Sequence, residues 1–580
     1  MTVETFFANF GHLADAPNGV QKLRELILQL AVQGKLVPQD FNEEPASALL
    51  EKVESEKKRL KELGKIKKLP TAEAVNKDEI LFRTPQGWEW PRLDTVCSYI
   101  QRGKGPKYVE QSDIPVVSQK CVQWAGFTLA PARFICPSTL EKYAEERFLR
   151  TGDLLWNSTG TGTIGRINVY KHEDNPYEKV VADSHVTVVR PVLLDSGYIW
   201  IWLASPYIQA DLEGNASGST NQVELATSVV KAHVIPLPPL EEQKRIVAKV
   251  DQLMALCDEL EDRQQKQQQG RMRLNNATLD ALLTASEADE FADHWQRIST
   301  NFDLLYDHPE TIAKLRAAIL QLAVQGKLVT QDPNDEPAST LLERIKAEKG
   351  RLVKEKLIRK EKPLAAVQES AYPFQLPSAW EWTRLGTLCK VVEYGTSQKS
   401  HDHSSGVPVL RMNNIDGGRV HHSNLKYVGS DIKDLPKLYL KQGEILFNRT
   451  NSYELVGKAG VFEGNDDKFT FASYLIRASL FQEEIVPAFV NYALNSSYFR
   501  ITQIEPEITQ QCGQANFNGT KLKNTLVPLP SRAEQKRIVA KVDQLMTLCD
   551  KLEAKLNQAK QHSEKLMEST LRQVSGTEGI

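Results

Sequence analysis

The sequence predicts an α+β protein built from one unit that is written twice. Residues 23–68 return as residues 315–360, a displacement of 292 positions, with most side chains kept. The same displacement relates residues 236–261 to residues 528–553. Between these repeated helical segments lie two stretches of mixed helix and strand pattern that share only a skeleton. The repeat therefore predicts two similar but non-identical halves.

Length and composition are those of an ordinary multidomain protein. At 580 residues the chain is too long for a single core. Its net charge is −2, with 25% charged and 41% hydrophobic residues. The overall charge gives no argument for a nucleic-acid partner, so any such argument must be local.

Cysteine usage and the N-terminus indicate a cytoplasmic protein. The seven cysteines form no C-x-x-C pair, which favours a reducing compartment. The first ten residues lack the basic and apolar regions of a signal peptide, and no run approaches the roughly 18 apolar residues of a membrane span. We therefore expect a cytoplasmic protein that does not contact a membrane.

The first part of each unit is expected to form two short helices. Apolar residues recur at helical spacing from Val20 to Leu30, and Gly34 ends that helix. Pro45 begins a second helix, which Gly64 closes. The charged run at its end is expected to be solvated, with contact to DNA phosphate as the alternative.

The two variable stretches are expected to be α+β. Short apolar runs at 153–156, 167–170 and 186–189 predict strands in the first stretch. Longer apolar runs predict helices at 197–212 in the first stretch and at 486–501 in the second. The clearest landmark that they share is GDLLWNSTG at 152–160, which matches GEILFNRTN at 443–451.

Each unit ends in a helix with the apolar seam of a coiled coil. The seam residues alternate at spacings of four and three, which is narrower than the stripe of a globular helix. Prolines followed by two glutamates predict that the first of these helices begins near Leu240. Because the two seams are nearly identical, we expect them to pack on each other. They consist of Ile246, Val250, Leu253, Cys257 and Leu260, and of Ile538, Val542, Leu545, Cys549 and Leu552.

No motif for a self-contained active site is found in the sequence. Residues 160–165 match G-x-G-x-x-G, but the next residues alternate as a strand, which predicts a turn rather than a dinucleotide site. The chain lacks a Walker A sequence, an N/D-P-P-Y/F signature and an H-E-x-x-H motif. The histidines between 401 and 422 lack helical ligand spacing, so we interpret them as surface loop rather than as a metal site.

Polar and basic side chains recur at matching positions of both variable stretches. The loop at 101–108 contains three cations and no acid, which suits contact with phosphates. Arg, Asn and Gln follow strands in these stretches, and such side chains pair with guanine and adenine edges. Each alone could cap a turn, but their recurrence favours DNA contact. The predicted DNA-binding residues are Arg102, Lys104, Lys107, Tyr108, Gln119, Lys120, Trp124, Asn157, Ser158, Thr159, Arg166, Arg411, Asn413, Asn414, Asn448, Arg449, Thr450, Asn451 and Lys458.

The repeated segments resemble a known family. LRELILQLAVQGKLVPQD, the GWEW before the first variable stretch, the GDLLW-type loop and PLPPLEEQKRIVAKVDQLM are similar to the specificity (S) subunit of type I restriction-modification systems. The similarity covers nearly the whole chain. The length and the N-terminal scaffold copy look most like the type IB branch.

The resemblance implies a non-catalytic subunit with pseudo-two-fold symmetry. Each variable stretch would be a target recognition domain that reads one half of a bipartite site in double-stranded DNA. The long helices would form an antiparallel coiled coil that sets the spacing between the halves. Two methyltransferase (M) subunits would dock on the repeated helices, and restriction (R) subunits would join them. S-adenosylmethionine, ATP and Mg²⁺ would be bound by those partners, and no cofactor by this chain.

The expected organisation has six parts, and two other functions remain open. The first alternative is a DNA methylase or nuclease with its chemistry in the variable stretches. The second is an architectural scaffold whose variable stretches bind protein. The parts are an N-terminal helical scaffold (1–90), a first recognition domain (91–235), a first coiled-coil helix (236–284), a connector with a second scaffold (285–382), a second recognition domain (383–527) and a second coiled-coil helix (528–580).

Overall fold

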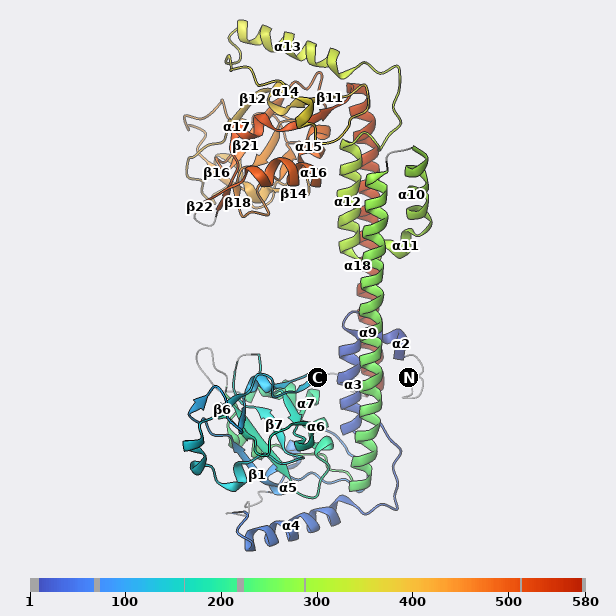
Figure 1. The fold of residues 1–580 in the computed structure, drawn as a ribbon, viewed down its shortest axis with the longest axis vertical. Coiled ribbons are helices and arrows are strands. Elements are labelled where there is room, and N and C mark those ends of the chain that lie inside the picture. The colour runs from blue at the N-terminus through green and yellow to red at the C-terminus, as the bar shows by residue number, and fades with distance from the viewer. Residues whose placement is uncertain are drawn as a thin grey trace. The chain divides into compact units, whose positions relative to one another are not determined.

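The computed structural model of the protein describes residues 10–66, 74–160, 162–215, 224–285, 288–511 and 514–575. The chain divides into two compact units. One comprises Met1–Gln267 with Ala559–Ile580, and the other comprises Gln268–Gln558. Each unit contains helices and one mixed α/β domain (Figure 1).

The first unit begins with helices, continues into a domain of short strands, and ends in a long helix. Its helices are α2 (Phe10–Ala14), α3 (Gly19–Val32), α4 (Ala46–Glu62), α5 (Leu93–Val96), α6 (Ser196–Leu203), α7 (Pro206–Asn215), α8 (Thr227–Ala232) and the start of α9 (Leu240–Thr284). Its strands are β1 (Cys97–Arg102), β2 (Tyr108–Val109), β3 (Pro115–Val117), β4 (Val122–Gln123), β5 (Gly126–Phe127), β6 (Arg133–Ile135), β7 (Leu154–Asn157), β8 (Ile167–Val169), β9 (Val181–Ala182) and β10 (Val186–Pro191).

The second unit follows the same order. Its helices are α10 (Ala288–Thr300), α11 (Phe302–Leu305), α12 (Pro309–Val324), α13 (Ala338–Lys354), α14 (Leu385–Leu388), α15 (Pro487–Asn495), α16 (Ser497–Phe499), α17 (Gly519–Asn524) and the start of α18 (Arg532–Ser575). Its strands are β11 (Glu381–Arg384), β12 (Cys389–Tyr394), β13 (Val407–Leu410), β14 (Ile415–Asp416), β15 (Arg419–Val420), β16 (Lys426–Val428), β17 (Ile445–Asn448), β18 (Thr450–Asn451), β19 (Ala459–Val461), β20 (Thr470–Phe471), β21 (Leu475–Leu480), β22 (Thr509–Gln511), β23 (Gln514–Asn516) and β24 (Leu526–Leu529).

The scaffold helices form where the sequence predicts them, and glycine is required at their turns. After α3, Gly34 has a φ of 69°, and a Cβ at this position would lie 2.4 Å from Cγ of Pro85. After α12, Gly326 has a φ of 72°, and its Cβ would lie 2.6 Å from Cγ of Pro377. A left-handed backbone and a close neighbour together leave room for glycine alone, so the repeated QGK sequence is a structural requirement.

One lysine of the charged run is an exception to the expected solvated helix end. Lys57 on α4 is buried, and its Nζ donates to the carbonyl oxygens of Asp94 at 2.7 Å and Thr95 at 2.9 Å. Lys349 repeats this on α13, donating to the carbonyls of Gly386 and Cys389. Because these carbonyls belong to the entry of each α/β domain, the lysines tie the scaffold helix to the domain.

A buried carboxylate makes a second tie at the start of each long helix. Glu242 of α9 accepts hydrogen bonds from Nε1 of Trp88 at 3.0 Å and from Nε2 of Gln39 at 2.6 Å. Burial raises the pKa of this carboxyl, and the two donors oppose the rise. The second unit repeats the arrangement with Glu534, Trp380 and Gln331, and there too burial raises the pKa of the glutamate.

The central sheet of the first α/β domain is buried on both faces. It is antiparallel with the order β1-β10-β7-β8. Leu154 and Trp156 of β7 share a core with Tyr198 and Trp202 of α6. Leu155 points to the opposite face and joins a separate core. A second sheet, β2-β6-β3-β9, contains the parallel pair β3 and β9.

The second α/β domain has the same plan with a larger central sheet. The strand order is β12-β21-β17-β19-β15-β14. Ile445 and Phe447 of β17 share a core with Phe489 of α15, whereas Leu446 joins a different core. Two small sheets, β16-β13-β20 and β18-β23-β22, complete the domain, and β11 pairs with β24 where the chain enters and leaves it.

The strands predicted in the first domain are confirmed, but each predicted long helix is divided. The run predicted as one helix at 197–212 forms α6 and α7, which separate at Ser205. Pro206 cannot donate a backbone hydrogen bond, so it begins a new helix rather than extending the first. The run predicted at 486–501 likewise forms α15 and α16, separated at Ser496, whose hydroxyl caps α16 by accepting from the N–H of Phe499.

The two long helices run antiparallel, but their seams do not pack on each other as expected. α9 begins in the first unit and ends in the second, whereas α18 does the reverse. The α9 seam shares a core with α3 and with Met567 and Val574 near the end of α18. The α18 seam shares a core with α12 and with Leu279 and Leu282 near the end of α9. In an antiparallel pair, each seam lies level with the far end of the partner helix rather than with its own copy.

The seam residues are covered as a coiled-coil pattern predicts. Seven of the ten are buried and three are half-buried. The buried residues are Ile246, Val250, Leu253, Cys257, Ile538, Val542 and Cys549, and the half-buried ones are Leu260, Leu545 and Leu552.

The connector that precedes the second scaffold is helical. α10 and α11 carry Phe291, Trp295, Ile298 and Leu305, which pack into the same core as α12. The acidic residues between these apolar positions fit a helix with one covered face. Within the described residues, no helix is long and apolar enough to cross a membrane.

We expect the paired tryptophans to stabilise their units through the buried glutamates. Trp88→Phe and Trp380→Phe each remove one of two donors to a buried carboxylate, and each should lower the free energy of unfolding by about 1–3 kcal/mol. Urea unfolding of the full chain measures this loss. Trp124→Phe is the control, because Trp124 is 52% exposed, and an equal loss in the control would contradict this account.

Candidate nucleic-acid interface

The basic loop at 101–108 uses part of its charge inside the domain. Arg102, at the end of β1, pairs with the carboxylate of Glu224 and donates to the carbonyl of Leu225 at 2.6 Å. Lys104 lies over the ring of Tyr143, with its Nζ 5.8 Å from the centroid. Lys107 is exposed, and Tyr108 is half-buried under the guanidinium of Arg133. Lys104 and Lys107 are thus both exposed, whereas Arg102 is engaged within the domain.

The loop after β7 is not exposed as the sequence predicted, because it is bonded into the domain. Asn157 is buried, and its Nδ2 donates to the carbonyls of Gln119 at 3.1 Å and Val122 at 3.2 Å. Ser158 is buried and bonds to the hydroxyl of Thr187 and the carbonyl of Trp156. Thr159 is buried, and its Oγ1 forms a hydrogen bond of 2.6 Å with Nδ1 of His185. The prediction that Asn157, Ser158 and Thr159 are exposed is wrong.

The matching loop after β17 divides into buried and accessible residues. Asn448 and Thr450 are buried, and Oγ1 of Thr450 donates to Oδ1 of Asn516 at 2.8 Å. Arg449, between them, is half-buried with its guanidinium 4.8 Å from the ring centroid of Tyr394. Asn451 is half-buried and accepts from the backbone N–H of Ser452. Arg449 and Asn451 are therefore accessible to a ligand, whereas Asn448 and Thr450 are enclosed by the fold.

The turn after β13 also contains one structural asparagine. Asn414 is buried; its Oδ1 accepts from the N–H of Arg411 and its Nδ2 donates to the carbonyls of His421 and Ser423. These bonds close the turn, so the prediction that Asn414 faces DNA is wrong. Asn413 is exposed, and Arg411 is half-buried with a bond to the carbonyl of Asn424.

The remaining candidates surround these loops. In the first domain, Lys120 and Trp124 are exposed, and Oε1 of Gln119 accepts from Oγ1 of Thr163 at 3.2 Å. Arg166 donates to Oε1 of Gln123 and to the carbonyl of Gly162. Lys458 occupies the matching place in the second domain and pairs with Asp416 at 2.6 Å.

Tyr394 and the segment at 509–516 also lie at the loop after β17, although neither is among the residues predicted from the sequence. Tyr394 ends β12 and is 43% exposed. β22 pairs with β23, and β23 pairs with β18, which places this segment beside Arg449 and Asn451. Its sequence, TQQCGQAN, is two short polar runs around a Cys-Gly pair, and this pattern was a signal for a hairpin. The matching segment of the first domain, 216–223, lies outside the described residues.

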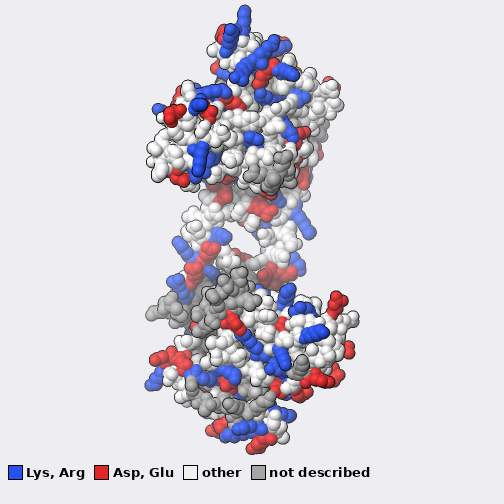
Figure 2. All heavy atoms as spheres, turned by 90° about the vertical axis from the view of Figure 1, so that its left-hand side faces the viewer, with Lys and Arg blue, Asp and Glu red and all other residues white. Residues whose placement is uncertain are grey.

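The charge on the visible face is dispersed. Figure 2 shows lysine and arginine interspersed with aspartate and glutamate on each unit, with uncharged surface between them. This agrees with the net charge of −2. A DNA-binding face here would depend on individual cations rather than on one large basic patch.

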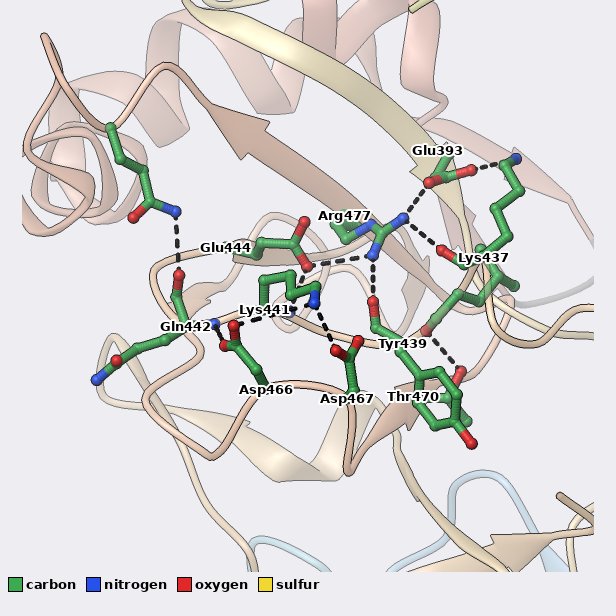
Figure 3. Close-up of polar contacts among 12 residues, drawn as sticks. Glu393, Lys437, Tyr439, Lys441, Gln442, Glu444, Asp466, Asp467, Thr470 and Arg477 are labelled. Carbon is green, nitrogen blue, oxygen red and sulfur yellow. Dashed lines mark hydrogen bonds and ion pairs between the residues drawn. The ribbon is translucent and has the colours of Figure 1, made fainter. Parts of the chain in front are cut away.

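One buried acid in each domain, Asp153 and Glu444, is paired with an arginine. In the second domain, Arg477 on β21 pairs with Glu393 and, at 3.2 Å, with Glu444 (Figure 3). In the first, Arg190 pairs with Asp153 at 2.6 Å. Burial raises the pKa of Asp153 and of Glu444, and the arginines oppose the rise. Arg190 and Arg477 lie on strands of the central sheets, so these ion pairs are internal to the domains. Within the described residues, no group of three or more His, Cys, Asp or Glu side chains could hold a metal ion.

We expect the buried asparagine to matter for stability and an exposed one not to. Asn157→Ala removes the donor to one buried and one part-buried carbonyl and should lower the free energy of unfolding by about 1–3 kcal/mol. Asn413→Ala changes an exposed side chain and should leave stability within about 0.5 kcal/mol. Urea unfolding of both variants tests this distinction, and a large loss for Asn413→Ala alone would reverse the assignment.

Comparison with known proteins relates both halves of the chain to one family. The family described as type I restriction modification DNA specificity domain matches residues 85–268 and again residues 377–561. The EcoAI and EcoEI type I restriction enzyme specificity subunits of Escherichia coli are each 32% identical to this chain, covering 94% of it and 92% of the relative. A chain from a structural study of complex assembly in the type I R-M system aligns with a TM-score of 0.49 and 17% identity, over 85% of this chain and 99% of that one.

Proposed function

We propose that the two domains of this chain each read one half of a bipartite site in double-stranded DNA. The chain belongs to the type I restriction-modification DNA specificity family and is a non-catalytic specificity subunit. The observation that carries this proposal is one framework that presents two different surfaces. Asn157 and Asn448 are buried at matching positions, while the residues beside them differ. A shared frame with variable neighbours suits two readers of different sequences.

The accessible candidates divide by chemistry. Lys107, Lys120 and Arg449 supply charge for phosphates, and Asn413 supplies an amide suited to an adenine edge. Gln119 and Asn451 are half-buried amides at the edge of the same loops. The buried residues Ser158, Thr159 and Asn414 would position these loops rather than touch DNA.

The repeated scaffold supports two equivalent docking places for partner subunits. α3 and α4 have their copies in α12 and α13, so a subunit that binds one pair would find a second pair of nearly identical sequence. We propose two methyltransferase subunits on these copies and restriction subunits joining the assembly. S-adenosylmethionine, ATP and Mg²⁺ would be bound by those partners.

Exchange of one recognition domain should change one half of the recognised site. Because, within the described residues, no core of the first domain includes residues of the second, replacing residues 98–231 by the same segment of a relative should leave the other half-site unchanged. Single-molecule sequencing of DNA from cells that produce the hybrid with its methyltransferase partner reads out the methylated motif. A motif altered in both halves would contradict independent reading.

The long helices should set the number of base pairs between the half-sites. A seven-residue insertion keeps the seam phase and lengthens a helix by about 10 Å, or about three base pairs of DNA. Inserted after Gln267 and after Gln558, it should widen the unspecified gap of the methylated motif by about that number. Insertion into α9 alone is the control, since it puts the helices out of register and should abolish methylation. An unchanged gap in the double insertion would refute the spacing role.

A further inference from the structure

The two domains have an equivalent junction, here called the strand-end junction, where three segments meet. It contains the last residue of β1 or β12, the residue that follows the buried Asn157 or Asn448, and the returning segment that precedes α8 or α17. The N–H of Leu225 donates to the carbonyl of Ser158 at 2.8 Å, and the N–H of Phe517 donates to the carbonyl of Arg449 at 2.8 Å. The displacement of 292 positions makes Leu225 and Phe517 equivalent.

The arginine of this junction comes from a different segment in each domain. The strand ends in Arg102 in the first domain and in Tyr394 in the second. The loop position is Ser158 in the first domain and Arg449 in the second. One domain therefore takes its arginine from the strand, and the other takes it from the loop.

Each arginine places its guanidinium against another residue of the junction, and Nη1 of Arg449 also donates to the carbonyl of Ser473 at 3.4 Å. Nη2 of Arg102 donates to the carbonyl of Leu225, on the returning segment. Arg449 lies over the ring of Tyr394, the residue that replaces Arg102, and Oη of Tyr394 accepts from the N–H of Gly519 on the returning segment. In each case Nε is buried without a hydrogen-bond partner among the described residues, so the outer nitrogens carry the contacts.

A charge that is kept while its source changes indicates a ligand common to both domains. Base edges differ between two half-sites, whereas the phosphate backbone is the same in every sequence. A base-reading residue would vary with the domain, but a phosphate-binding guanidinium would be retained. The presence of one guanidinium at each junction thus favours phosphate over a base edge.

The two guanidinium groups differ in whether a neighbouring acid neutralises their positive charge. Arg102 is paired with Glu224, whose side chain is 54% exposed. The equivalent of Glu224 is Asn516, which is neutral and accepts from Thr450. The charge of Arg449 is therefore not cancelled by an acid at this position, whereas that of Arg102 is.

We propose that the strand-end guanidinium binds a DNA phosphate in both domains, and that Glu224 holds the site of the first domain closed until phosphate displaces it. This rests on the proposed function and adds an asymmetry to it. The second domain engages the backbone with a preformed cation. The first must exchange an internal ion pair for the phosphate, so it binds only where the remaining contacts favour the exchange.

The test is a salt titration of DNA binding by the complex of this chain with its methyltransferase subunits. The probe is a duplex that carries the methylated motif determined from host DNA. Arg449→Gln should reduce the slope of log affinity against log salt by about one and weaken binding about five- to tenfold at 0.1 M salt. Arg449→Lys should keep most of the slope, because it keeps the charge.

The closed state of the first domain has its own variants. Glu224→Gln should tighten binding roughly two- to tenfold, and this gain should vanish in the Arg102→Gln background. Asn516→Asp should install the same closed state in the second domain and weaken binding. Glu178→Gln is the charge-matched control, since Glu178 is exposed on a different loop of the first domain.

Each outcome decides a separate point. Unchanged slopes for Arg449→Gln and Arg102→Gln, with methylation of the motif intact, would overturn the phosphate site and leave the proposed function standing. Relaxed specificity at one base pair with an unchanged slope would assign a base contact instead and overturn it too. A gain from Glu224→Gln that persists without Arg102, or that Glu178→Gln equals, would overturn the closing role. Failure of the complex to discriminate any duplex would instead count against the proposed function.

Discussion

The fold depends on burial of each long-helix seam against a scaffold helix that lies far away in the sequence. α9 packs with α3 and α18 packs with α12, and an α/β domain lies between the members of each pair along the chain. Both ends of each domain are thus fixed at the scaffold. The buried glutamate at the start of the long helix strengthens this closure, because its partners, a tryptophan and a glutamine, precede the domain. The domain is held as a closed insertion, so its loops can change without changing the frame.

Much of this architecture could be predicted from the sequence, because repetition and apolar spacing are read directly from the chain. The starts of α4 and α9, the seam residues and the strands around 154–157 and 186–191 follow from proline, glycine and hydrophobic pattern. The partner of each seam could not be predicted in the same way. Two identical seams suggest each other as partners, and only the antiparallel direction shows that each faces the end of the other helix.

The candidate site was harder to predict, because sequence shows that a residue is polar but not where its bonds go. Asn157 and Asn414 have the side chain of a base reader, yet each is consumed in closing a turn. Arg477 lies in a strand and proves to be the centre of a buried charge network. By contrast, Tyr394 offered no signal at all by itself. Its importance arises from the arginine stacked on it, which comes from a loop 55 positions further along the chain.

The division of the long helices also imposes an order on how the protein can be made. Met567 and Val574, which complete the core of the first unit, belong to the last segment of α18. A ribosome synthesises the whole second unit before it reaches them. The second unit can therefore assemble its core from residues that are already synthesised, whereas the helices of the first unit keep an uncovered face until Met567 and Val574 have been made. The first unit is therefore begun first on the ribosome but completes its core last.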